Sequence, residues 1–109
     1  MNDDIIPVDS YDFDEKIENG IVMVEFYAEW CVRSRGLEPI IEEIADCYYD
    51  NVRVLALDVE QSPDIAMHYE IESTPTIIIF KDGKPVQRIR GANPPSTYAD
   101  ALEYILENK

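Results

Sequence analysis

Short apolar runs alternate with helix-like segments along this 109-residue chain. Val, Ile, Leu and aromatic residues dominate four of the runs, which we expect to be strands: 21–27, 52–59, 76–81 and 86–90. Helix-like segments precede the first run, follow each of the first two, and close the chain. This order predicts an α/β fold with a mixed sheet of four to five strands flanked by four helices. The first two strands are expected to be parallel and the last two to form a hairpin.

Local signals bound the expected helices. Ser10 is expected to cap a first helix over 10–19. Apolar residues at steps of three and four predict a long amphipathic helix over 32–49, and a Ser-Pro start predicts a short helix over 63–69. No linker or internal repeat divides the sequence, so we expect a single domain over 1–109.

The acidic composition limits the partners of the chain. Its formal net charge is −14 and its pI is about 4.2, so its surface repels nucleic acid and anionic membranes. No apolar run reaches the ~20 residues needed to cross a bilayer, and the acidic N-terminus does not resemble a secretory signal. We therefore expect a cytoplasmic protein, and we expect it to be a monomer. One histidine and two distant cysteines do not have the spacing of a metal site, and no cofactor is expected.

Cys31 is the strongest candidate for a reactive residue. It follows an apolar run that ends in Trp30, and it precedes the long predicted helix. Unpaired N–H groups and the dipole at a helix N-terminus favour a thiolate, and Arg33 and Arg35 add positive charge. We expect these features to lower the pKa of the Cys31 thiol below its usual value of about 8.5. Three positions after Cys31 stands Ser34, whose hydroxyl can donate a hydrogen bond to the sulfur.

Five motifs in order resemble the thioredoxin family, over about residues 8–106. They are Val24-Glu25-Phe26-Tyr27-Ala28-Glu29-Trp30-Cys31, Pro39 in the following helix, Thr74-Pro75-Thr76, Phe80-Lys81-Asp82-Gly83, and Gly91-Ala92. The resemblance implies the thioredoxin fold and a cis peptide bond before Pro75, facing Cys31. It also implies a shallow groove for a substrate peptide, formed by Trp30, Val32, Arg33, Thr74, Pro75, Gly91 and Ala92.

The sequence departs from the family pattern in three places. Ser34 stands where a resolving cysteine is usual, Val32-Arg33 replaces Gly-Pro, and Ala56 stands where the family often has a lysine. By the same resemblance, Glu25 occupies the position of a buried acid. Burial would raise its pKa and let it exchange protons with the sulfur chemistry; the alternative is a tolerated buried acid without a role. Without a lysine at position 56, the protonated form of Glu25 is favoured.

The single active-site cysteine limits the chemistry. A thiolate attacks a disulfide to give a mixed disulfide, which a second thiol must then release. Ser34 has no comparable exchange chemistry. Cys47 lies 16 residues further along the predicted helix, about 24 Å from Cys31 at about 1.5 Å per residue, whereas a disulfide needs Cα atoms within about 7 Å. An external thiol is therefore needed to complete the cycle.

Three functions are compatible with these residues. The first is monothiol exchange through Cys31, with disulfide-containing proteins or small-thiol adducts as partners. The second assumes that Ser34 replaces the second cysteine of a Cys-X-X-Cys parent, which would be an ordinary disulfide reductase recycled by a thioredoxin reductase. The third is a non-catalytic peptide-binding or adaptor module that uses the groove at Trp30 and Pro75.

Overall fold

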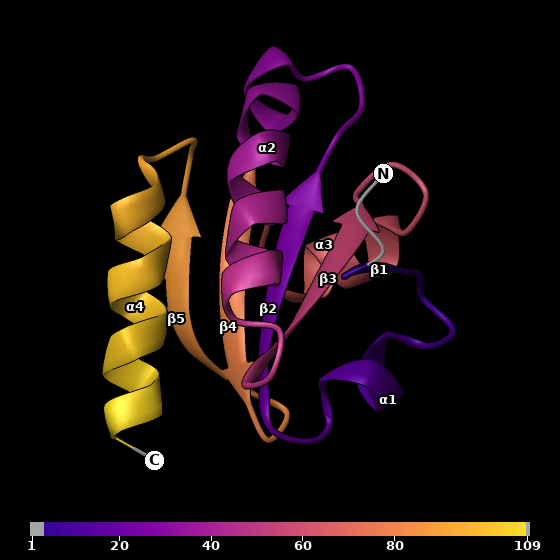
Figure 1. Ribbon diagram of the computed structural model, residues 1–109. Coiled ribbons are helices and arrows are strands. Elements are labelled where there is room, and N and C mark those ends of the chain that lie inside the picture. The colour runs from indigo at the N-terminus through magenta and orange to yellow at the C-terminus, as the bar shows by residue number, and fades with distance from the viewer. Residues whose placement is uncertain (1–3, 109) are drawn as a thin grey trace.

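The computed structural model describes residues 4–108, and its centre is a five-stranded mixed sheet in the order β1-β3-β2-β4-β5 (Figure 1). The strands are β1 (Ile5–Val8), β2 (Ile21–Tyr27), β3 (Val52–Asp58), β4 (Thr76–Lys81) and β5 (Lys84–Arg90). β3 is parallel to both β1 and β2, whereas β4 is antiparallel to β2 and β5. The predicted α/β class, mixed sheet, parallel pair and hairpin are confirmed.

Helices cover both faces of this sheet. α2 (Val32–Cys47) and α4 (Pro95–Glu107) pack on one face, and α1 (Phe13–Ile17) and α3 (Pro63–His68) pack on the other. A hydrophobic core lies on each face of the sheet, and β2 contributes side chains to both, because successive side chains of a strand point to opposite faces. Val22, Val24 and Phe26 face α1 and α3, and Met23 faces α2 and α4. Glu25 follows Met23 in this alternation and therefore places a carboxylate under α2.

The N-terminal region differs from the sequence-based expectation. β1 was not predicted as a strand, because it is a short edge strand interrupted by Pro7 and pairs only with β3. The first helix is also shorter than predicted and begins at Phe13. Ser10 does not cap it: the Ser10 hydroxyl donates to the carboxylate of Asp64, and the Asp9 carboxylate instead accepts the N–H of Tyr11 at 2.9 Å.

The antiparallel strands bring distant segments to one end of the sheet. Phe26 at the end of β2 lies opposite Thr76 at the start of β4, and Thr76 lies opposite Arg90 at the end of β5. The residues that follow β2, precede β4 and follow β5 must therefore meet at this end, where α2 begins (Figure 1). No helix in the part of the chain that the structure describes is long and apolar enough to cross a membrane.

Candidate active site

Cys31 occupies the N-cap position of α2. Its extended backbone (φ −82°, ψ 116°) turns the chain from the loop after β2 into the helix. Its N–H donates to the carbonyl of Ala28 at 3.0 Å, and its own carbonyl accepts the N–H of Arg35 at 3.1 Å. The thiol is half-buried and lies beside N–H groups of the first helical turn that have no partner within the helix.

Two further segments meet Cys31 at this end of the sheet. The Cys31 thiol lies 3.4 Å from the carbonyl oxygen of Thr74, to which it donates. The peptide bond between Thr74 and Pro75 is cis. The Pro75 carbonyl accepts the N–H of Gly91 at 2.9 Å. The segment at Thr74, 43 residues after Cys31, therefore lies against the sulfur, and the segment at Gly91 is bonded to it through Pro75.

Tyr98 fixes the Gly91 segment from below. Its ring is fully buried, and its hydroxyl donates to the Gly91 carbonyl at 3.2 Å while it accepts the N–H of Asn93 at 3.1 Å. Gly91 itself has a φ of +80°, a backbone conformation that favours glycine. The loop after β5 is therefore held in a defined position next to Pro75.

The pKa of the Cys31 thiol is lowered from 9.0 to about 7. The largest cause is a side-chain hydrogen bond with Thr74, followed by the backbone N–H of Ser34; the Ser34 side chain and the backbone of Arg33 lower the pKa further, against an opposing effect of burial. The direction agrees with the expectation from the sequence. The expected cause was partly wrong, because hydrogen bonds rather than the charges of Arg33 and Arg35 dominate.

Ser34 lies in the first turn of α2 and is buried. Its hydroxyl accepts the N–H of Ala28 at 3.4 Å and contributes to the lowered pKa of Cys31. Ser34 therefore lies where a second thiol would meet Cys31, but it presents an oxygen. Cys47 is the last residue of α2 and is exposed at the opposite end of the helix, so it cannot reach Cys31 while α2 is folded.

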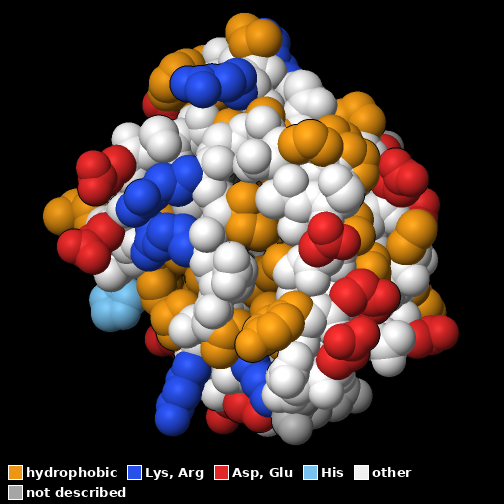
Figure 2. Space-filling view, turned by 90° about the vertical axis from the view of Figure 1, so that its left-hand side faces the viewer, with side chains coloured by type: hydrophobic (Ala, Val, Ile, Leu, Met, Phe, Trp, Pro, Cys, Tyr) orange, Lys and Arg blue, Asp and Glu red, His pale blue; other side chains and the backbone are white. Residues whose placement is uncertain are grey.

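The candidate groove combines exposed and fixed residues. Trp30 and Val32 are 68% and 72% exposed, although both are large and apolar. At the upper edge of the molecule, where α2 begins, Figure 2 shows hydrophobic side chains beside a basic one. Hydrogen bonds connect Thr74, Pro75 and Gly91 to Cys31 or to one another. Trp30, Val32, Arg33 and Ala92 are exposed around them.

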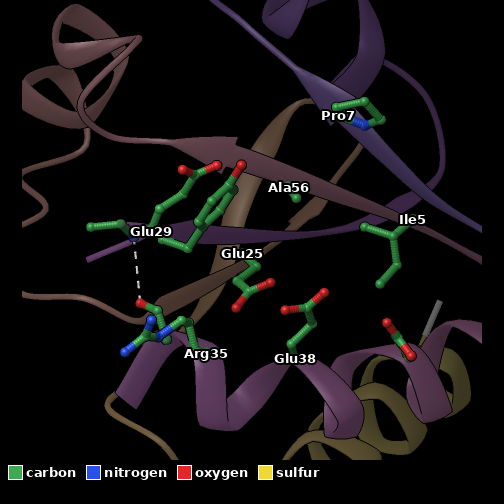
Figure 3. Close-up of a pocket in the computed structure, with 11 residues that line it drawn as sticks. Ile5, Pro7, Glu25, Glu29, Arg35, Glu38 and Ala56 are labelled. Atoms are coloured by element: carbon green, nitrogen blue, oxygen red, sulfur yellow. Dashed lines mark hydrogen bonds between the residues drawn. The ribbon is translucent and has the colours of Figure 1, made fainter. Parts of the chain in front are cut away.

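Glu25 lies under α2 in the wall of a cavity of about 470 Å³ (Figure 3). The strand register places it beside Ala56 of β3, and Ala56 in turn beside Pro7 of β1. The Glu38 side chain reaches down from α2, and the two carboxylates point toward one another (Figure 3). Burial, and secondly the charge of Glu38, raise the pKa of Glu25 from 4.5 to about 7. Sequence reasoning missed Glu38, although Ser34, Glu38 and Glu42 recur at steps of four along one helix face.

Known proteins are similar to this chain in both sequence and fold. The family model for thioredoxin matches residues 4–104. The chain is 41% identical to a thioredoxin of Staphylococcus epidermidis over 99 residues, which cover 91% of this chain and 95% of that protein. A Staphylococcus aureus thioredoxin is 40% identical with the same coverage. The chain belongs to the thioredoxin family.

Solved structures agree with this membership. A thioredoxin from Malassezia sympodialis superposes with a TM-score of 0.82 at 29% identity and covers 92% of this chain and 89% of its own. A chain from a structural study of thiol resolution in a yeast mitochondrial 1-Cys peroxiredoxin, via glutathione and thioredoxin systems, reaches a TM-score of 0.84 at 33% identity. It covers 91% of this chain and 93% of its own. The thioredoxin family and fold support thiol–disulfide oxidoreductase chemistry with disulfide-containing proteins as substrates.

Two features set this thioredoxin-family site apart from a dithiol site. The described residues hold two free cysteines, at opposite ends of α2, and the third position after Cys31 is a buried hydroxyl. No group of three or more His, Cys, Asp or Glu residues within 4–108 could hold a metal ion. The site therefore presents one sulfur, with a lowered pKa, beside a buried hydroxyl.

Proposed function

We propose that this chain catalyses thiol–disulfide exchange through Cys31 alone and leaves release of the product to an external thiol. The observation that carries the proposal is the hydrogen bonding of the Cys31 sulfur by the Thr74 side chain and by N–H groups of the first turn of α2, which favours its thiolate. About half of the sulfur is then ionised at neutral pH, whereas an ordinary thiol is only a few per cent ionised.

The proposed cycle has three exchange steps. The Cys31 thiolate attacks one sulfur of a substrate disulfide; a Cys31–substrate disulfide forms, and the other substrate sulfur leaves as a thiolate that takes a proton. A thiolate from a small thiol then attacks the Cys31 sulfur; the second substrate sulfur leaves as a thiol, and a Cys31–small-thiol disulfide remains. A second small thiolate attacks the small-thiol sulfur of that disulfide, which frees Cys31 and releases the disulfide of the two small thiols. Two electrons pass from the external thiols to the substrate disulfide. Ser34 takes no part in any of these bond exchanges.

Glu25 is proposed as the proton donor and acceptor of this cycle. Its pKa of about 7 lets it both hold and release a proton near neutral pH, and Ser34, which neighbours Cys31, lines the same cavity. If Glu25 serves this role, the variant Glu25→Gln retains alkylation of Cys31, and its release step between pH 6 and 8 follows only the ionisation of the external thiol, without the further pH dependence of the parent. An unchanged pH profile would leave Glu25 as a buried acid without a role.

The groove around Cys31 is proposed to bind an extended segment of the substrate. Trp30, Val32 and Ala92 offer exposed apolar surface, and Arg33 adds one positive charge beside it. Thiol carriers with a negative charge suit this site better than cationic ones. The cytoplasm, where small thiols are kept reduced, suits a cycle that depends on an external thiol. A thioredoxin reductase would be a partner if a second cysteine stood at position 34.

Mass spectrometry tests the proposal directly. The variant Cys47→Ser is incubated with a peptide disulfide at pH 7, and its intact mass is measured without reductant. We expect one peptide adduct on Cys31, which a small thiol removes, and no adduct on the matched variant that also carries Cys31→Ser. A free, accessible Cys31 that forms no adduct would instead favour the peptide-binding module.

A further inference from the structure

The cavity under α2 has the volume of a small-molecule site, and Cys31 is not among the residues that line it. Its volume of about 470 Å³ falls within the roughly 300–1,000 Å³ typical of ligand pockets. β1 and β3 form an apolar floor from Ile5, Pro7 and Ala56, and α2 forms the opposite wall. Ala56 is central to this space, because its methyl group leaves the room that a longer side chain would fill.

Acidic side chains dominate the polar part of the lining. Four glutamates border the cavity, and Arg35 is the one basic residue among its lining residues; the glutamates are Glu25, Glu29, Glu38 and Glu42. In Figure 3 the Arg35 side chain extends away from the carboxylate of Glu25. Arg35 is also not among the groups that shift the pKa of Glu25, so it does not neutralise that carboxylate.

Glu25 directs a buried carboxylate into the cavity. Its side chain is only 6% exposed, yet no hydrogen bond or ion pair joins its carboxylate to another of the described residues. The carboxylate instead points into the cavity, toward the carboxylate of Glu38 (Figure 3). Burial disfavours the charged form of this carboxylate, and the charge of Glu38 opposite it disfavours that form further.

We propose that the cavity binds a primary alkylammonium ion, with its NH₃⁺ group between Glu25 and Glu38 and its methylene chain on the floor formed by Ile5, Pro7 and Ala56. An ammonium group has three donors and can serve both carboxylates at once. A metal ion fits less well, because no cluster of three or more ligating residues with suitable geometry exists within residues 4–108. The apolar floor likewise suits methylene groups rather than a hydrated ion.

The proposal predicts a pH dependence that is specific to this cavity. The pKa of Glu25 is about 7, so ionised Glu25 rises from about a tenth of the molecules at pH 6 to about nine tenths at pH 8. Binding of the cation should therefore tighten about tenfold over this range. The other ionisable groups that line the cavity are Tyr27, Glu29, Arg35, Glu38 and Glu42.

The test uses n-butylammonium chloride at constant ionic strength, with backbone amide and Glu25 carboxyl NMR shifts as readouts. We expect a saturable shift at residues that line the cavity, roughly tenfold weaker binding in Glu25→Gln, and weaker binding in Ala56→Met, which fills the space without a charge. The matched control is Glu103→Gln on α4, which removes one exposed charge outside the cavity and should change affinity less than twofold. Circular dichroism checks that each variant is folded, and either cavity variant alone decides the question.

Two results would overturn the proposal. One is a shift that never saturates and is spread over acidic residues of the whole surface, which indicates diffuse counterions. The other is an affinity that does not depend on Glu25 specifically. It would be weakened equally by Glu25→Gln and Glu103→Gln, or would stay constant between pH 6 and 8. None of these readouts depends on thiol–disulfide exchange, so the proposed activity and this site can fail separately.

Discussion

We expect the Thr74 side chain to raise the thiolate fraction of Cys31, so its replacement should be visible in the alkylation rate. The pKa of Cys31 is lowered from 9.0 to about 7, and the side-chain hydrogen bond with Thr74 is the largest cause. At pH 7 this change raises the thiolate fraction from about 1% to about 50%, whereas the intrinsic reactivity of the weaker base falls about six- to tenfold. The net gain is about five- to eightfold.

The assay is the rate of iodoacetamide alkylation of Cys31 between pH 5 and 10, in a Cys47→Ser background. We expect a midpoint near pH 7 in the parent and a higher midpoint in Thr74→Val, which keeps the shape of the side chain but removes its hydroxyl. Thr97→Val on α4 is the matched control and should leave the midpoint unchanged. A parent midpoint near 9, or equal midpoints in the parent and in Thr74→Val, would refute the reasoning.

Two further predictions concern the charges near the site. Burial raises the pKa of Glu25 from 4.5 to about 7, so the folded state binds more protons than the unfolded state in this range. The free energy of unfolding should consequently fall by up to about 3 kcal/mol as pH rises from about 4.5 to above 7. Glu25→Gln should abolish this fall. Urea unfolding that depends on pH in the same way in the parent and in the variant would contradict the prediction. Charge reversal at Arg33 and Arg35 should slow exchange with oxidised glutathione several-fold at low salt while leaving or speeding exchange with cationic cystamine. Equal effects on both disulfides in stopped-flow measurements would show that the arginine charges do not select the thiol carrier.

The central part of the fold could be predicted because each central strand carries its own signal. β2 and β4 are buried along almost their whole length and are nearly continuous apolar runs, and β3 is mainly apolar with an exposed Arg53. The turn at Asp82-Gly83 has positive φ at both residues, and an Asp-Gly pair is a local signal for such a turn.

The N-terminal region could not be predicted in the same way, because its structure depends on distant partners. β1 has four residues with a central Pro7, and its pairing with β3 is invisible to any local pattern. Ser10 resembles a helix cap, but the hydroxyl is used by Asp64, 54 residues away in sequence. Local propensity was overridden by these contacts.

Part of the site could be predicted from local sequence signals, and the rest depends on contacts between distant strands. Cys31 and Ser34 could be located from the strand, Trp30 and the helix that follows them, and the resemblance to thioredoxins supplied Pro75 and Gly91. The cavity could not be predicted, because it requires Pro7, Ala56 and Glu25 in one row across three strands. Because β1 was not predicted as a strand, the position of Pro7 beside Ala56 could not be predicted either.

The most direct test of single-thiol exchange at Cys31 is the lifetime of the mixed disulfide. The parent and the variant Ser34→Cys, both in a Cys47→Ser background, react with the same peptide disulfide, and intact mass is followed over time without added thiol. The account predicts a Cys31–peptide adduct that persists in the parent until a small thiol is added. In Ser34→Cys the peptide should leave at once, because the introduced thiol displaces it and closes an intramolecular disulfide with Cys31. A parent adduct that decays as fast as that of the variant, or a parent that never forms an adduct on Cys31, would contradict it.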